Sequence, residues 1–254
     1  MHRRLAAALA AAVVSSALHA APDACAAKSG AATAALVELY TSEGCDSCPP
    51  ADRWLSGLPA AGFGPGTVVA LALHVDYWDY IGWKDPFAQG RFSARQRELA
   101  TTGRSRVVYT PQVILAGKDF RGWRDRARFA ASVAAINATP ARAALELARA
   151  ATEVRAQAAV PRPEDRDDAA LYVAVYESGL ASRVGAGENR GATLRHDFVV
   201  REWWGPVALD AAGAAALVRQ ADARALARGG VAAFVQRRRT GEVLQALALP
   251  ACAV

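Results

Sequence analysis

The sequence predicts an α/β domain over residues 33–139 and a mainly β domain over residues 140–254. In the first segment, short apolar runs typical of strands alternate with amphipathic runs typical of helices. In the second segment, short runs of alternating apolar and polar residues are separated by glycine-rich breaks. The length of 254 residues suits one large domain or two small ones, and 53% hydrophobic residues are enough to build a packed core.

Residues 1–21 have the three parts of a secretory signal peptide. Arg3 and Arg4 give a basic start, an uncharged apolar run follows over 5–17, and small residues come next. This run is too short to span a hydrocarbon core about 30 Å thick. We therefore expect a periplasmic or secreted protein with no membrane attachment once the leader is cleaved. An uncleaved N-terminal anchor is the alternative interpretation.

The charge of the chain is mildly positive. Removal of residues 1–20 takes away two of the 30 basic residues, which leaves 28 against 24 acidic residues. The basic triplet Arg237-Arg238-Arg239 lies near Glu242 and is not a sustained basic stripe with stacking aromatic residues. We expect no nucleic-acid partner, and no motif indicates a nucleotide, flavin or haem cofactor.

A Cys-x-x-Cys motif lies between the first predicted strand and the first predicted helix. Residues 35–40 are apolar and strand-like, Cys45 and Cys48 follow a short turn, and two prolines precede a helical run over 51–58. At a helix N-terminus, free backbone N–H groups and the helix dipole favour a thiolate over a thiol. We expect Cys45 to be the attacking thiolate and Cys48 to resolve the mixed disulfide.

A single Cys-x-x-Cys motif also fits other functions. Zinc sites use it, normally with a second pair or with paired histidines. A thiol-based metal binder, such as a copper carrier, would use Cys45, Cys48 and His74. A binding module with an inert structural disulfide is the third interpretation. We assign no metal ligand or cofactor from the sequence.

A second motif indicates the fold of the first domain. A buried strand is predicted over 67–75 and a helix over 91–102, Thr110-Pro111 then begins a strand that ends at Leu115, and a further helix covers 124–136. A proline at this point matches the place where thioredoxin-like folds put a cis proline beside the disulfide. We therefore predict a thioredoxin-like domain in which Thr110 and Pro111 meet an extended substrate peptide. An ordinary trans proline is the alternative.

An acidic and aromatic cluster follows the second predicted strand. Site residues collect at the carboxyl ends of strands in open α/β sheets, and His74, Asp76 and Trp78 lie at such an end. We expect His74 or Asp76 to move protons for Cys48 and Trp78 to form a wall of the substrate groove. The alternative is that these side chains only pack against the core.

The C-terminal half contributes strands, a turn and one more cysteine. Residues 143–160 fit either a helix or a hairpin, and strands are expected over 171–177, 194–203 and 231–239. Glu188 and Asn189 fit either a simple turn or residues that reach the Cys-x-x-Cys face. Cys25 and Cys252 lie near the two ends of the exported chain, where domain termini are often close. We expect a disulfide between them, with two free thiols as the alternative.

Several stretches resemble an exported bacterial family of thioredoxin-like proteins known as a domain of unknown function. The resemblance rests on the motifs EGCxxCPPAD, HVDYWD and YTPQ, within the stretches Glu38–Asp52, His74–Asp79, Phe92–Gln96, Tyr109–Gln112, Gly187–Asn189 and Leu194–His196. It implies a thioredoxin-like fold with a β-rich extension and supplies no activity. Asp46-Ser47 stands where thioredoxin has Gly-Pro between its cysteines, and these residues tune the thiolate.

The sequence therefore predicts a thiol–disulfide oxidoreductase whose substrates are protein thiols or disulfides. The predicted site consists of Cys45, Cys48, His74, Asp76, Trp78, Thr110 and Pro111. Neither the direction of exchange nor the oligomeric state follows from the sequence.

Overall fold

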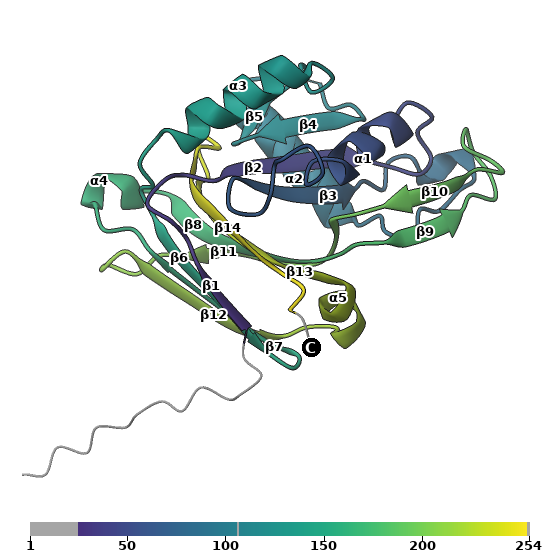
Figure 1. Ribbon diagram of the computed structural model, residues 1–254. Helices are drawn as coiled ribbons and strands as arrows, with labels where there is room; N and C mark the ends of the chain where they lie inside the picture. Colours follow the sequence, from purple (N-terminus) through teal and green to yellow (C-terminus); the bar gives the residue numbers. More distant parts are fainter. Residues whose placement is uncertain (1–24, 106, 253–254) are drawn as a thin grey trace, which may run out of the picture.

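The computed structural model describes residues 25–105 and 107–252, and the predicted leader over 1–21 lies outside these ranges. The described residues form a mixed α/β protein in which strands predominate (Figure 1). The helices are α1 (Pro49–Ser56), α2 (Gly90–Thr102), α3 (Arg126–Asn137), α4 (Pro163–Arg166) and α5 (Ala223–Arg228), with a 3-10 helix η1 (Asp79–Ile81). The strands are β1 (Cys25–Lys28), β2 (Ala35–Thr41), β3 (Val68–His74), β4 (Gln112–Leu115), β5 (Lys118–Asp119), β6 (Ala144–Ala150), β7 (Glu153–Ala159), β8 (Ala169–Glu177), β9 (Leu180–Arg183), β10 (Thr193–His196), β11 (Val199–Ala208), β12 (Ala214–Gln220), β13 (Gly229–Arg237) and β14 (Val243–Pro250).

The main sheet has eight strands and contains strands from both halves of the chain. Its order is β14-β13-β8-β11-β3-β2-β4-β5. β2 and β3 are parallel. β11 pairs with β3, also in parallel, through Val199 and Ala72. The sheet therefore continues across position 140, where the sequence predicts the start of a second domain. β1, β6, β7 and β12 form a separate four-stranded sheet, and β9 and β10 form a hairpin.

Alternation along β2 and β3 sends side chains to two separate cores. Ala35, Val37 and Leu39 face one side, where they pack with residues of α1 and α3. Leu36 and Tyr40 face the other side, where they pack with residues of α2 and with aromatic residues of β8 and β13. This arrangement follows from the two-residue period of a strand, because successive side chains point to opposite faces. α1 therefore rests on the sheet and holds the preceding turn at the carboxyl end of β2.

The C-terminal half packs its second sheet against the main sheet. Alternate residues of β6 and β7 are buried against β8, β13 and α5, so residues 143–160 form a hairpin and not a helix. The expected strand over 194–203 is divided between β10 and β11. The division falls next to Phe198, which has a positive φ of 59°. β10 leaves the sheet there and pairs with β9, which places this hairpin beside α1 (Figure 1).

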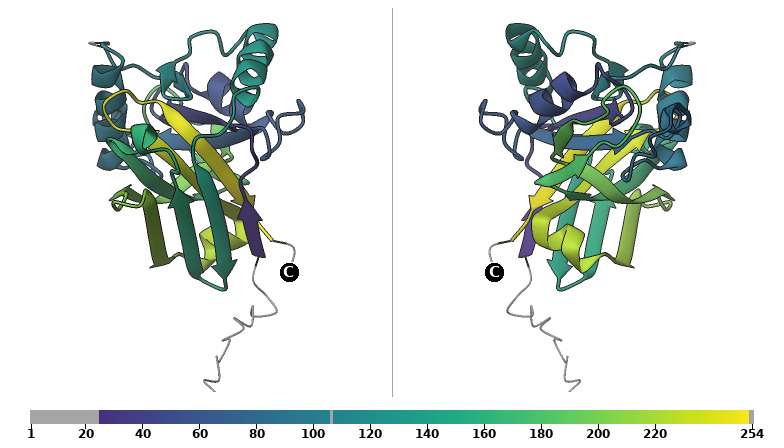
Figure 2. Two further views of the ribbon diagram at one scale, coloured as in Figure 1. Left: turned by 90° about the vertical axis from the view of Figure 1, so that its left-hand side faces the viewer. Right: turned by 90° about the vertical axis from the view of Figure 1, so that its right-hand side faces the viewer.

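The two ends of the described chain meet in one place. β1 lies beside the end of β14, as both views of Figure 2 show. A disulfide joins Cys25 of β1 to Cys252, with a Cα–Cα distance of 6.2 Å. Among the described residues, none of the helices is long and apolar enough to cross a membrane.

Candidate active site

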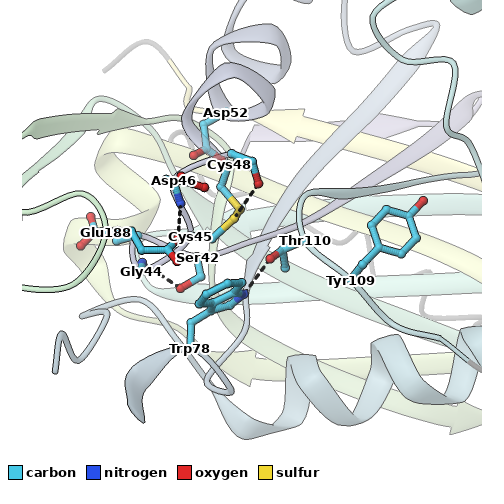
Figure 3. Close-up of a disulfide and its surroundings, with 12 residues drawn as sticks. Ser42, Gly44, Cys45, Asp46, Cys48, Asp52, Trp78, Tyr109, Thr110 and Glu188 are labelled. Atoms are coloured by element: carbon cyan, nitrogen blue, oxygen red, sulfur yellow. Dashed lines mark hydrogen bonds between the residues drawn. A yellow bond between two sulfur atoms is a disulfide. The ribbon is translucent and has the colours of Figure 1, made fainter. Parts of the chain in front are cut away.

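The Cys45–Cys48 disulfide lies in the turn that joins β2 to α1 (Figure 3). The two Cα atoms are 5.4 Å apart. Cys45 is 1% exposed and Cys48 is 0% exposed. The Sγ atom of Cys45 lies 3.3 Å from the hydroxyl oxygen of Ser47. The motif is thus a local disulfide in a covered position at the start of a helix.

The start of α1 follows directly from its sequence. Cys48 is the residue before the helix, and Pro49 and Pro50 occupy its first positions, where a missing N–H has no intrahelical partner. The carbonyl of Cys48 accepts hydrogen bonds from the N–H groups of Ala51 and Asp52 at 2.8 and 3.1 Å. The next turn buries an apolar face of the helix on the sheet, so the cysteine pair is fixed at the end of a packed element.

Trp78 and Thr110 come together beside the disulfide. The indole N–H of Trp78 donates to the hydroxyl of Thr110 at 2.7 Å (Figure 3). A Cβ on Gly44 would lie 3.1 Å from the Cβ of Trp78, so the base of the Trp78 side chain packs against the turn that carries Cys45. The peptide bond between Thr110 and Pro111 is cis. These predicted site residues thus form one neighbourhood.

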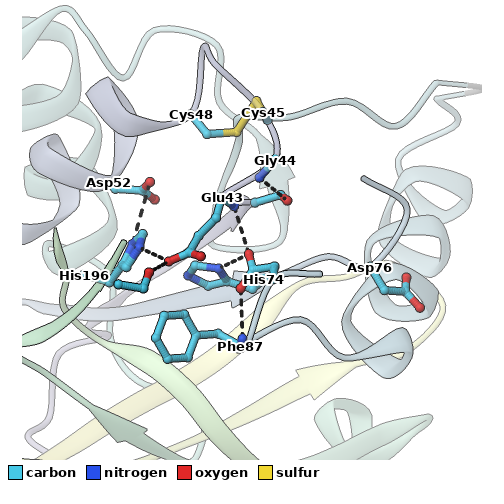
Figure 4. A network of polar contacts seen from close by, with 12 residues as sticks. Glu43, Gly44, Cys45, Cys48, Asp52, His74, Asp76, Phe87 and His196 are labelled. Carbon is cyan, nitrogen blue, oxygen red and sulfur yellow. Dashed lines mark hydrogen bonds and ion pairs between the residues drawn. A yellow bond between two sulfur atoms is a disulfide. The ribbon is translucent and has the colours of Figure 1, made fainter. Parts of the chain in front are cut away.

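Asp76 does not belong to that neighbourhood. Its carboxylate accepts a hydrogen bond from the hydroxyl of Ser93 at 2.5 Å, at the start of α2. Figure 4 shows Asp76 turned away from the two cysteines. The two alternative candidates for the proton carrier therefore lie apart, because His74 lies beneath the disulfide and Asp76 faces α2.

A buried cluster of ionisable side chains lies beneath the cysteine turn (Figure 4). The Nδ1 atom of His74 lies 2.7 Å from a carboxylate oxygen of Asp85, which also accepts the backbone N–H of Glu43 at 2.8 Å. The Nε2 atom of His196 lies 2.9 Å from the carboxylate of Glu43. The two imidazole rings are 4.9 Å apart between centroids. Asp52 of α1 completes the cluster.

Pairing sets the charge states within this cluster. Burial alone would raise the pKa of Glu43, but hydrogen bonds from His196 and Ser182 outweigh it and lower that pKa. Burial likewise opposes ionisation of His74 and Asp85, but their mutual attraction raises the pKa of His74 and lowers the pKa of Asp85. Burial raises the pKa of Asp52, so this carboxyl group holds its proton to a higher pH.

Four buried polar atoms near this cluster have no hydrogen-bond partner among the described residues. They are Thr41 Oγ1, Asp52 Oδ1, His74 Nε2 and His196 Nδ1. Thr41 and His74 are neighbours in the register of β2 and β3, and His196 Nδ1 lies 3.9 Å from the other oxygen of Asp52. A buried polar atom without a partner costs about 1–3 kcal/mol. These atoms lie in the same part of the core as the two histidine–carboxylate pairs.

The described part of the chain holds no group of three or more His, Cys, Asp or Glu residues arranged to bind a metal ion. The cluster contains residue types that bind metals, but its atoms are directed at one another in pairs.

The hairpin of β9 and β10 contributes residues that sequence reasoning did not assign. The side-chain amide of Asn189 donates to the carbonyls of Glu43 and Cys45, both at 2.9 Å. The carboxylate of Glu188 accepts the backbone N–H of Asp46 at 3.0 Å. The open choice for Glu188 and Asn189 is thereby decided, because both side chains reach the cysteine turn.

Further contacts from this hairpin end on Glu43. The hydroxyl of Ser182 and the ring of His196 both hydrogen-bond its carboxylate. The indole N–H of Trp83, from the segment between η1 and α2, donates to the same carboxylate at 2.9 Å. Glu43 lies two residues after the end of β2, whereas Ser182 and His196 come from the C-terminal half. The C-terminal half therefore forms part of the site.

The fold and the site define a class, namely a mixed α/β protein that carries a Cys-x-x-Cys pair at disulfide distance. The chain belongs to the family described as "Protein of unknown function (DUF1223)", whose pattern matches residues 36–236. The predicted relation to a family of unknown function is confirmed to that extent. No curated protein matches the chain.

Two solved structures are similar to the whole fold. Protein AGR_C_4864 from Agrobacterium tumefaciens has 25% sequence identity and a TM-score of 0.64, with 88% of this chain and 96% of that chain covered. HBP35 of Porphyromonas gingivalis has 14% identity and a TM-score of 0.62, with 87% of this chain and 76% of that chain covered. The second likeness concerns the fold alone.

Proposed function

We propose that this protein is an exported thiol–disulfide oxidoreductase that acts through Cys45 and Cys48. The observation that carries the proposal is the position of the pair, at the start of α1, beside Trp78 and Thr110 and above a buried ionisable cluster. The parallel β2–β3 pair, the antiparallel β4–β5 pair and the helices on both faces support a thioredoxin-like arrangement for residues 33–139.

The chemistry is an exchange of disulfides with a protein substrate. In the reducing direction, the thiolate of Cys45 attacks a substrate disulfide and forms a mixed disulfide, and one substrate thiolate leaves. Cys48 then attacks the Cys45 sulfur, which forms the Cys45–Cys48 disulfide and releases the second substrate thiolate. Two electrons pass to the substrate, and the reverse sequence oxidises a substrate dithiol.

Cys48 needs a proton partner inside the protein. The residue is 0% exposed, so its thiol cannot exchange protons directly with water. Asp52 lies one helical turn further along α1, with a raised pKa, and faces His196. We propose that Asp52 exchanges a proton with Cys48 and that His196 and His74 carry it onward. His74 thus keeps the role predicted from the sequence, and Asp52 takes the role expected of Asp76.

The first experiment measures the reduction potential of the Cys45–Cys48 pair by equilibration with glutathione and mass spectrometry. A value of roughly −120 to −270 mV, with Cys45 alkylated first, is expected of a working exchanger. The Cys25–Cys252 pair is quantified separately in the same peptide map. A potential below about −300 mV would identify the Cys45–Cys48 bond as a structural disulfide and remove the proposal.

A further inference from the structure

We infer that the Cys45–Cys48 pair works as a reductant, passing electrons from its dithiol to protein disulfides. This inference rests on the proposed function and adds its direction. It depends on what surrounds the Cys45 sulfur, because a disulfide exchanger becomes a strong oxidant when its protein stabilises the reduced, thiolate form. Three features of the structure act against that stabilisation.

The first feature is the loss of backbone donors at the start of α1. Helix N-termini stabilise thiolates through free N–H groups. Here Pro49 and Pro50 have no N–H to offer. The N–H of Cys48 donates to the carbonyl of Cys45 at 3.2 Å, and the N–H of Asp46 donates to Glu188. Of the backbone donors around the pair, those of residues 49 and 50 are therefore missing, and those of Cys48 and Asp46 are occupied.

The second feature is the negative charge beside Cys45. Asp46 follows it directly, and the carboxylate of Glu188 sits 3.0 Å from the backbone nitrogen of Asp46 (Figure 3). Both side chains are exposed, and within the described residues neither forms an ion pair with a lysine or arginine. A nearby carboxylate raises the pKa of a thiol, because two negative charges repel each other.

The ionisable groups beneath the disulfide do not offset the negative charge beside Cys45. The ionisable side chains that hydrogen-bond or pair at and beneath the turn are Glu43, Asp52, His74, Asp85, Glu188 and His196, and Asp46 lies within the turn. The acids outnumber the two histidines. His74 is paired with Asp85 and His196 with Glu43, so neither imidazole is left over to balance a thiolate.

The third feature is burial. Cys45 is 1% exposed, and removal from water disfavours the charged thiolate more than the neutral thiol. Among the described side chains, the hydroxyl of Ser47 is the group that contacts the Cys45 sulfur as a hydrogen-bond partner. One hydroxyl is a weak substitute for the donors and positive charge that a stabilised thiolate requires.

These features define the place of the protein in an electron-transfer sequence. The disulfide is its more stable form, so its dithiol gives up two electrons to a substrate disulfide, which becomes two thiols. Each cycle leaves the Cys45–Cys48 bond oxidised. The dithiol must therefore be regenerated by a second dithiol reductant that itself becomes a disulfide, and a membrane or soluble protein dithiol has the required chemistry.

The test compares wild-type protein with Glu188→Gln, Asp46→Asn and the double variant. Glutamine keeps an oxygen that can accept the Asp46 N–H, so Glu188→Gln removes the charge and retains the contact. Glu202→Gln is the matched control, because Glu202 also accepts a backbone N–H, from Asp222 at 2.7 Å, in another part of the fold. The readouts are the equilibrium constant with the glutathione couple and the pH midpoint of Cys45 alkylation by iodoacetamide.

We expect the wild-type equilibrium to favour the disulfide to a degree typical of reductants. Each charge removal should shift the equilibrium constant with glutathione toward the dithiol by about threefold to tenfold, because one pKa unit corresponds to a tenfold change. Each should also lower the pH midpoint of Cys45 alkylation. The double variant should show the larger shift, and Glu202→Gln none. A wild-type equilibrium typical of strong oxidants, or variants that match the control, would overturn the inferred direction and leave the proposed exchange intact. A pair that fails to exchange with glutathione at all removes the proposed function instead.

Discussion

The two disulfides of this protein lie in opposite kinds of surroundings. The Cys25–Cys252 bond joins residues separated by 227 positions, at the edge of an apolar core made by the C-terminal half. The Cys45–Cys48 bond joins residues separated by three positions, above a buried group of histidines and carboxylates. The first ties the ends of the fold together, whereas the second constrains one turn of chain.

The difference separates a long-range cross-link from a local one. A cross-link restricts the unfolded chain more as the loop that it closes grows. The long-range bond therefore acts mainly on stability. The local bond restricts little, yet it is surrounded by polar atoms whose burial costs free energy. The local bond thus contributes little to stability, and the polar cluster beneath it supports the proposed role in thiol–disulfide exchange.

The largest expected effect is on the free energy of unfolding when each bond is removed. The double variant Cys25→Ser/Cys252→Ser should lose about 5 kcal/mol by the loop-entropy relation, while Cys45→Ser/Cys48→Ser should lose about 2 kcal/mol. Denaturant titration of both variants measures the two losses. Thiol–disulfide exchange should survive the first change and vanish in the second. Equal losses of stability would mean that the contrast between the two bonds is wrong.

The next effect concerns the carboxylate that links the two halves of the site. Glu43→Gln removes a buried charge that accepts hydrogen bonds from Trp83, Ser182 and His196. Breaking such a pair should lower the free energy of unfolding at neutral pH by about 3 kcal/mol. The measurement is urea unfolding, with the exposed Glu146→Gln as control, since its pair with Lys28 should contribute less than about 1 kcal/mol.

The pH dependence of the Glu43→Gln effect has a defined sign. The pKa of Glu43 is lowered, because its hydrogen bonds outweigh the opposing effect of burial. A lowered pKa gives stability that is present above the unfolded-state pKa and is lost as the pH falls through the folded-state pKa. The difference between wild type and variant should therefore shrink in acid. A difference that stays constant between neutral and acidic pH would show that the Glu43 charge is not responsible.

Local sequence was sufficient to predict one side of the site. The apolar run before Cys45, the prolines after Cys48 and the helical spacing that follows are short-range patterns, so strand, turn and helix could be placed directly. Trp78 was also predicted, from its place after a strand end, and Thr110 from its proline, which stands where thioredoxin-like folds place one beside the disulfide; the two side chains are hydrogen-bonded. The orientation of Asp76 was not predictable, since β3 ends at His74 and strand alternation no longer decides which way a later side chain points.

The other side of the site depends on contacts between distant parts of the chain. The hydrogen bonds of Asn189 to Cys45 and of His196 to Glu43 each join residues more than 140 positions apart, and no periodic pattern encodes such a meeting. Asp85 lies in a loop between η1 and α2, so it too carries no signal of periodicity. Sequence reasoning detected Glu188 and Asn189 only as a turn with two possible roles. The hairpin reaches α1 because β10 leaves the main sheet, a feature of tertiary packing.

A smaller effect is expected from the buried carboxyl group of α1. Asp52→Asn removes the proposed proton partner of Cys48, so attack by Cys48 on the mixed disulfide should slow by about tenfold to a hundredfold, with attack by Cys45 unchanged. Stopped-flow trapping of the mixed disulfide separates the two steps, and Asp76→Asn is the matched control. Burial raises the pKa of Asp52, so this group favours folding at low pH and loses that contribution as the pH rises through its folded-state pKa. The variant should therefore gain stability relative to wild type toward high pH. Equal slowing of the Cys48 step by Asp52→Asn and Asp76→Asn would contradict the assignment.

The smallest expected effect concerns the hairpin that holds the cysteine turn. Asn189→Ala removes two hydrogen bonds to the carbonyls of Glu43 and Cys45, which should lower the free energy of unfolding by about 1–2 kcal/mol. The turn should loosen as a result, and iodoacetamide should reach the Cys45 sulfur of the reduced protein faster. Ser178→Ala is the control, because it removes a hydrogen bond to the N–H of Phe198 at the base of the same hairpin and leaves the turn untouched. If both variants lose stability but only Asn189→Ala is alkylated faster, the hairpin acts on the chemistry of the local disulfide. If both variants are alkylated at the same rate, the hairpin contributes to folding alone. The C-terminal half would then act only on stability, as the Cys25–Cys252 disulfide does.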